Sequence, residues 1–100
     1  NASIEPLFRE FAAFRAVMTA APRMAPAALA DALTPIADGN GAFRLLALEA
    51  RGAALIGAGD LAAAEDTLRA VVVDEATPPG LRQRVEAVLT AIGADVEAEG

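Results

Sequence analysis

The stretch that decides the fold is LEARGAALIGAGDLAAAEDTL, residues 48–68. Its Gly-Asp pair, Gly59 and Asp60, separates two apolar runs whose large side chains recur at helical spacing. Two small residues, Gly52 and Ala64, allow two helix backbones to approach closely. The remaining space between the helices would be filled by three large side chains: Leu48, Leu55 and Leu68. The stretch therefore predicts two antiparallel helices joined at a glycine turn.

The rest of the chain extends this helical pattern. Hydrophobic residues make up 55% of the 100 residues, more than a quarter of the chain is alanine, and residues typical of strands are sparse. Proline and glycine divide the sequence into five apolar runs, which we predict as helices near residues 6–20, 26–37, 42–58, 60–74 and 79–92. We expect one all-α domain over residues 3–93, because 100 residues are too few for two independent cores.

Several local features refine this prediction. Residues 42–58 are apolar around most of the helix, so this helix is expected in the middle of the structure. Pro22 is expected to push Ala21 out of helical geometry, and Pro35 removes one backbone donor from the second helix and should kink it. The Val71–Val73 run has no second strand to pair with, and we interpret it as the end of a helix. Residues 94–100 alternate acidic and small residues, and we expect a frayed tail.

The ionisable residues argue against several classes of function. The chain has a net charge of −6, all eight of its basic residues are arginine, and it contains no Cys, His, Lys or Tyr. A surface of this sign repels phosphate backbones, so we expect no nucleic-acid partner. Most groups that transfer protons, attack substrates or bind transition metals are missing, so we expect no enzyme, no metal site and no cofactor. A carboxylate-only enzyme is the weakest alternative.

A repeat is visible in the register of the helices. Phe8-Arg9, Phe43-Arg44 and Leu81-Arg82 each lie near the start of an odd-numbered helix, 35 and then 38 residues apart. Periods of this length are typical of stacked helical hairpins, in which neighbouring units bury one another's apolar faces. We therefore expect about two and a half repeat units in the chain.

Residues 48–68 resemble a tetratricopeptide repeat. The residues that carry the resemblance are Leu48, Gly52, Leu55, Gly59, Asp60, Ala64 and Leu68, whereas Arg51 stands where that motif usually has an apolar residue. More broadly, residues 5–92 resemble the C-terminal periplasmic part of the ancillary subunit of the bacterial SecYEG translocon, of the alphaproteobacterial type. The matching segments are PLFR (6–9), DGNGAFRLLALE (38–49), AGD (58–60) and PPGLR (78–82).

This resemblance implies a right-handed stack of tetratricopeptide-like hairpins. It also implies a location on the periplasmic side of the inner membrane, with the membrane reached only through an N-terminal anchor that this chain lacks. No run of residues here is apolar enough to cross a bilayer. We interpret residues 1–2 as a cloning remnant and the remainder as part of a longer protein.

The surface formed by the odd-numbered helices is the candidate binding site. In a tetratricopeptide stack these helices line the concave groove, which would bring together Phe11, Phe14, Met18, Leu46, Glu49 and Ile56. Large side chains there could hold an apolar segment of another protein, with methionine adapting to its shape. The alternative is that the same side chains belong to the core. The sequence therefore predicts a non-catalytic protein-interaction scaffold with protein partners, including translocon or envelope proteins, or else a module that forms a homodimer and has no groove ligand.

Overall fold

The computed structural model describes residues 4–94, and this part of the chain is all-helical. Its elements are α1 (Ile4–Ala20), the short 3₁₀ helix η1 (Ala21–Arg23), α2 (Pro26–Ala37), α3 (Arg44–Gly57), α4 (Leu61–Val73) and α5 (Pro79–Ala91). The five predicted helices are confirmed, and their ends differ from the prediction by two residues at most. The Val71–Val73 run is the last turn of α4, as predicted.

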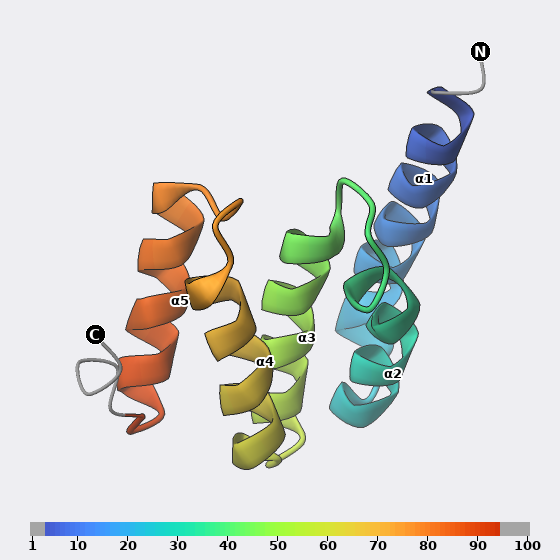
Figure 1. Ribbon diagram of the computed structural model, residues 1–100. Coiled ribbons are helices and arrows are strands. Elements are labelled where there is room, and N and C mark those ends of the chain that lie inside the picture. Colours follow the sequence, from blue (N-terminus) through green and yellow to red (C-terminus); the bar gives the residue numbers. More distant parts are fainter. Residues whose placement is uncertain (1–3, 95–100) are drawn as a thin grey trace.

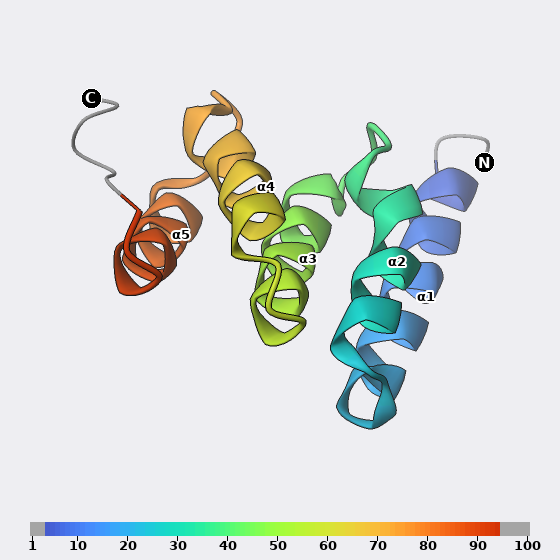
Figure 2. The ribbon, with the colours of Figure 1, turned by 90° about the horizontal axis from the view of Figure 1, so that it is seen from below.

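The helices lie in chain order across an elongated molecule. Figure 1 shows α5, α4 and α3 as a row, with α2 and α1 at its far end, and Figure 2 shows the same order from below. The molecule measures 45 × 31 × 18 Å along its principal axes. Helix α3 packs against α2 on one side and α4 on the other, while α5 packs against α4. The expectation that residues 42–58 form a central helix is therefore confirmed.

The main core lies between α2, α3, α4 and α5. Its most deeply buried large side chains come from three of these helices: Leu33, Leu68, Val71, Val85 and Leu89. A smaller cluster at the other end of α3 consists of Ala30, Ala54, Leu55 and Ala64. Because alanine dominates the smaller cluster, the helix backbones can approach closely there.

The turn between α3 and α4 has the geometry that a Gly-Asp pair supplies. Gly59 has a φ of +82°, a region that residues with a Cβ rarely adopt. The next residue, Asp60, caps α4 because its side chain accepts a hydrogen bond from the Ala63 N–H at 3.2 Å. Gly59 therefore ends α3 and Asp60 begins α4, and together they determine where the hairpin reverses direction.

Replacing Asp60 with Ala should lower the free energy of unfolding by about 1 kcal/mol, since an orphan amide of α4 loses its acceptor. Urea denaturation followed by circular dichroism measures this change. Asp66→Ala is the matched control, because Asp66 is an exposed residue inside the same helix. Equal stability of Asp60→Ala and the wild type would mean that the cap contributes nothing.

Pro22 acts differently from the prediction. The expectation that Pro22 takes Ala21 out of helical geometry is wrong, because the chain continues from α1 directly into η1, with Pro22 in its first turn. A proline is tolerated there because the first helical positions lack an intrahelical acceptor for an N–H. Helix α2 continues through Pro35 and ends at Ala37, as predicted, and the Thr34 hydroxyl donates to the Ala30 carbonyl 2.9 Å away.

The expected cloning remnant at residues 1–2 lies outside the described residues, as does the expected acidic tail apart from Ala94. Ala94 packs against the main core, and its N–H donates to the Leu89 carbonyl at 2.9 Å. None of the helices in residues 4–94 combines the length and apolar character that a membrane span requires.

Candidate binding groove

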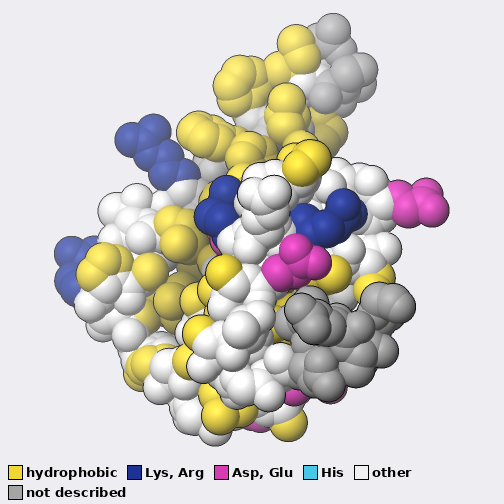
Figure 3. Space-filling model, turned by 90° about the vertical axis from the view of Figure 1, so that its left-hand side faces the viewer, with side chains coloured by type: hydrophobic (Ala, Val, Ile, Leu, Met, Phe, Trp, Pro, Cys, Tyr) yellow, Lys and Arg dark blue, Asp and Glu magenta, His cyan; other side chains and the backbone are white. Residues whose placement is uncertain are grey.

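Helix α1 has an exceptional surface, because none of its residues is fully buried. It carries five of the large exposed apolar side chains: Ile4, Leu7, Phe8, Phe11 and Met18. The first four are spaced so that they form one stripe of a helix. Figure 3 shows hydrophobic side chains gathered over the protruding end of the molecule that α1 forms. An apolar stripe of this kind on a protruding helix marks α1 as a candidate contact surface.

Phe43, which immediately precedes α3, connects α1 to the rest of the molecule. Its ring lies 5.7 Å from the Phe14 ring and 5.8 Å from the Phe11 ring, measured between centroids. Its backbone N–H donates to the Glu10 carboxylate at 2.6 Å. The same carboxylate lies where a Cβ on Gly41 would be, so a larger residue at this position would displace the Glu10 side chain. Phe43 therefore holds α1 through both its side chain and its backbone.

One face of α3 stays accessible although this helix lies in the middle of the molecule. Leu46, Ala50, Ala53 and Gly57 follow one another at helical spacing along it, and all four are exposed or half-buried. We call this face, between α1 and α5, the α3 groove. Three of its four residues are small, so the middle of the groove presents a smooth apolar floor.

The end of the groove near Gly57 is an apolar hollow of about 310 Å³. Met18 and Met24 form one wall, and Ala50, Ala53 and Gly57 form the floor. We call it the methionine hollow. Its lining includes no ionisable side chain, so it suits an apolar group.

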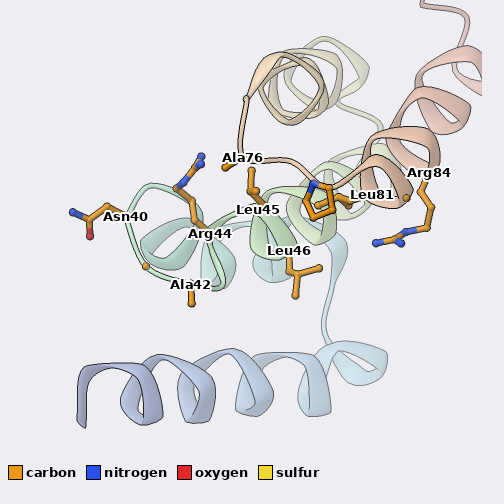
Figure 4. A pocket seen from close by; sticks show the side chains of 11 residues that line it. Asn40, Ala42, Arg44, Leu45, Leu46, Ala76, Leu81 and Arg84 are labelled. Carbon is orange, nitrogen blue, oxygen red and sulfur yellow. The ribbon is translucent and has the colours of Figure 1, made fainter. Parts of the chain in front are cut away.

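The other end of the groove opens into a larger cavity of about 750 Å³, which we call the arginine cavity. It lies where α3 and α5 begin, and the loops before these two helices form its rim. Leu45, Leu46 and Leu81 supply apolar lining, while Arg44 and Arg84 are its ionisable lining residues. In Figure 4, Leu46 points toward α1, Arg84 turns toward Leu46, and Arg44 points to the opposite side near Ala76.

Ion pairs hold both arginines of the cavity in place. Arg44 Nη2 lies 2.5 Å from Asp74 Oδ2, which joins the start of α3 to the end of α4. Arg84 donates from Nε and Nη2 to the two oxygens of Glu49, each at 3.0 Å. This bidentate bond raises the pKa of Arg84. Arg82 adds a third positive charge, and its guanidinium donates to the Val72 and Asp74 carbonyls.

The carboxyl of Asp74 should titrate below its ordinary value. Hydrogen bonds from Arg44 and from the Ala76 N–H lower its pKa below 3.8. Because the folded pKa is depressed, the stabilisation from Asp74 is present at higher pH and is lost as pH falls through the folded value. We expect an NMR titration of Asp74 to show a midpoint below 3.8, and the midpoint in Arg44→Gln to lie higher. An unchanged midpoint in the variant would mean that Arg44 does not cause the shift.

The predicted groove residues fall into three groups. Met18 and Leu46 line the methionine hollow and the arginine cavity, respectively, and Glu49 adjoins the cavity through its bond to Arg84. Phe11 lines a shallow depression on α1 itself. Phe14 and Ile56 are partly buried and pack against the main core. For Phe14 and Ile56, the structure therefore fits the alternative in which the predicted groove residues belong to the core.

The seven residues that carry the tetratricopeptide resemblance are either buried between helices or exposed in the turn between α3 and α4. Leu48, Gly52, Leu55, Ala64 and Leu68 are buried, and Gly59 and Asp60 form the exposed turn. A Cβ built on Gly52 would lie only 2.6 Å from Leu68 Cγ, so the two residues fit each other with no space to spare.

The sequence prediction missed the roles of three arginines. Arg51 donates from Nε to the Thr34 hydroxyl and from Nη1 to the Thr67 hydroxyl, each at 3.0 Å, and so bridges α2 and α4. Arg44 and Arg84 were not recognised as cavity residues. The register match between Arg44 and Arg82 could have indicated the cavity, because it places a cation at the start of both α3 and α5.

Across residues 4–94, no group of His, Cys, Asp and Glu side chains is arranged to hold a metal ion. Comparison with protein-family models, with curated proteins and with solved structures returns no match for this chain.

Proposed function

We propose that this chain is a non-catalytic protein-interaction module that binds a segment of another protein in the α3 groove. The observation that carries this proposal is the accessible face of α3. A central helix would ordinarily be covered on all sides, yet this one leaves an apolar stripe uncovered between an apolar hollow and a cavity. Concave apolar surfaces with a few polar groups at defined places are typical of binding sites.

The finer proposal is that the helices form a tetratricopeptide-like stack and that the module belongs to an accessory or chaperone-like subunit of the secretion translocon. Its support is the sequence resemblance over residues 5–92. The paired α3 and α4, joined by the Gly59-Asp60 turn, are compatible with such a repeat. The proposed place of action is the periplasmic side of the inner membrane, with partners among translocon and envelope proteins.

Site-specific photo-cross-linking tests the proposed groove. A photoreactive amino acid replaces Ala53 in the groove floor, and a second variant carries it at Ala70 on the exposed surface of α4. Because only Ala53 lies in the groove, we expect cross-linked protein adducts from envelope extracts at position 53 and few at position 70. Immunoblotting of the adducts with antibodies to translocon subunits tests the finer proposal separately.

Adducts of equal yield at both positions would contradict a role for the groove. If the adducts at position 53 contained no translocon or envelope protein, the proposed binding in the groove would stand, but the proposed periplasmic place of action would be contradicted. Phe14 and Ile56 are poor choices for variants in this experiment, because both pack against the core and their loss would also change stability.

A homo-oligomerisation module is the second candidate function, and the apolar stripe of α1 favours it. Phe8 is 64% exposed, and Leu7 is 48% exposed beside it. Two copies could bury these side chains against each other. We expect a concentration-dependent dimer in sedimentation equilibrium, and Leu7→Ser with Phe8→Ser should make the chain monomeric. A monomer at every concentration in the wild type would exclude this candidate.

A further inference from the structure

We propose that the partner segment is an extended peptide that carries a carboxylate about five residues from a large apolar side chain, with the carboxylate in the arginine cavity. This inference rests on the proposed function, since it specifies the chemistry of the segment that the α3 groove binds.

The charge around the cavity supplies the first argument. Three carboxylates lie beside it: Asp74 and Glu49 are bonded to Arg44 and Arg84, and Glu10 lies against Gly41 at the rim. The cavity lining itself includes Arg44 and Arg84 and no carboxylate. In a chain with a net charge of −6, a cavity lined by two arginines and no carboxylate stands out, and the carboxylate of an acidic ligand would complement that lining.

The donors left over on the arginines supply the second argument. A guanidinium has five N–H donors, and Glu49 accepts from one on Nε and one on Nη2 of Arg84, which leaves one N–H on Nη2 and two on Nη1. The Arg84 side chain is 57% exposed, so the remaining donors are accessible to a ligand. Glu49 also fixes the orientation of this guanidinium, which reduces the entropy that binding would cost.

The backbone adds two further sources of positive potential. Helices α3 and α5 both begin at the cavity, and neither N-cap residue, Phe43 or Pro78, caps its helix with a side chain. The first amides of a helix have no intrahelical acceptor, and each helix N-terminus carries roughly half a positive charge. At the start of α3 the Glu10 carboxylate already accepts from the Phe43 N–H, so a ligand carboxylate would find its backbone donors at the start of α5.

The geometry of α3 determines the spacing in the ligand. Leu46 lies in the arginine cavity and Gly57 in the methionine hollow, on the same face of the helix. Eleven positions of an α-helix span about 16 Å, a length that about five residues of extended peptide cover. Since the hollow is apolar and the cavity cationic, a peptide that fills both needs an apolar side chain at one end and a carboxylate at the other.

Fluorescence anisotropy with labelled, C-terminally amidated peptides tests this inference. The probe is a Ser/Gly-rich peptide with Leu and Glu five residues apart, and the comparison peptides have Gln instead of Glu or a Leu–Glu spacing of two residues. A fourth peptide is not amidated: its last residue is Gln, five residues from Leu, so that its only carboxylate is the C-terminal one. We expect the Gln peptide and the short-spaced peptide to bind at least about tenfold more weakly than the probe. Similar binding of the free-carboxylate peptide and the probe would show that either source of carboxylate is accepted.

A charge-balanced variant tests the cavity itself. Arg84→Gln combined with Glu49→Gln removes the guanidinium without leaving an unpaired carboxylate, and circular dichroism checks its fold. This variant should bind the Glu and Gln peptides equally, whereas Arg23→Gln, an exposed arginine away from the cavity, should keep the tenfold preference. Equal binding of the Glu and Gln peptides by the wild type would overturn the inference. If the wild type bound both peptides equally but position 53 still formed cross-linked adducts, the proposed binding function would stand and only the acidic ligand would be excluded.

Discussion

Gly52→Ala should destabilise this protein by about 2 kcal/mol, although alanine is the better helix former by about 1 kcal/mol. The reason is the close fit between α3 and α4. The new Cβ would lie 2.6 Å from Leu68 Cγ, and Leu68 is only 1% exposed, so it cannot turn away into solvent. Thermal unfolding followed by circular dichroism should show a melting temperature about 10 °C lower.

Gly80→Ala is the matched control for this prediction. Gly80 lies in the first turn of α5 with a normal φ, and a Cβ there would meet no atom within 4 Å. The same substitution should therefore raise stability by about 0.5 kcal/mol, because the unfolded chain loses freedom. If both variants shifted stability in the same direction, the close approach at Gly52 would not be the cause.

A double-mutant cycle makes the test more specific. Leu68→Ala alone should cost about 3 kcal/mol, since it leaves a cavity in the core. In the double variant the Cβ of residue 52 would occupy part of that cavity. The combined loss should therefore be smaller than the sum of the single losses by about 1–2 kcal/mol. Strict additivity would mean that the two positions do not pack against each other.

Phe43→Ala should release α1 while the rest of the fold persists. The substitution removes the ring that contacts Phe11 and Phe14, and α1 has no fully buried residue to hold it otherwise. Loss of these contacts should cost about 2–3 kcal/mol of local stability. In native-state hydrogen exchange, amides of α1 should exchange about 30- to 100-fold faster, while those of α4 and α5 change little.

Phe8→Ala is the matched control, because it removes the same side chain from a position that is 64% exposed. Exchange in α1 should stay within about twofold of the wild type. If Phe43→Ala accelerated exchange equally in every helix, Phe43 would be an ordinary core residue of the whole domain. No change in α1 would mean that its other contacts, the Glu10 hydrogen bond and the packing of Phe14 and Val17 against the core, are sufficient to hold this helix.

Local sequence patterns were sufficient where the structure depends on near neighbours. The Gly59-Asp60 pair predicted the turn, because a positive φ and a capping carboxylate are properties of those two residues. The nearly continuous apolar surface of residues 42–58 predicted a central helix, since only burial on several sides suits it. Pro22 was harder to interpret, because an α-helix and a 3₁₀ turn both accept proline in their first turn.

Contacts between distant residues could not be predicted in this way. The Glu10 carboxylate reaches the Phe43 N–H across 33 positions, and Arg84 reaches Glu49 across 35. Arg51 stands where the tetratricopeptide motif usually has an apolar residue, yet its guanidinium bridges two threonines, Thr34 on α2 and Thr67 on α4. The same limitation applies to Phe14 and Ile56, whose helical positions are compatible with either groove or core.

The order of residues alone was enough to predict the helices, the Gly59-Asp60 turn and the close pairing of α3 with α4. These features follow from backbone preferences and from the sizes of residues within one hairpin. Which face of α3 stays uncovered, and which charged side chains lie at the arginine cavity, became clear from the packing of the helices. That outcome depends on how α1 and α5 lie relative to α3, and their positions come from contacts such as those of Phe43 and Arg84, which join residues far apart in the chain.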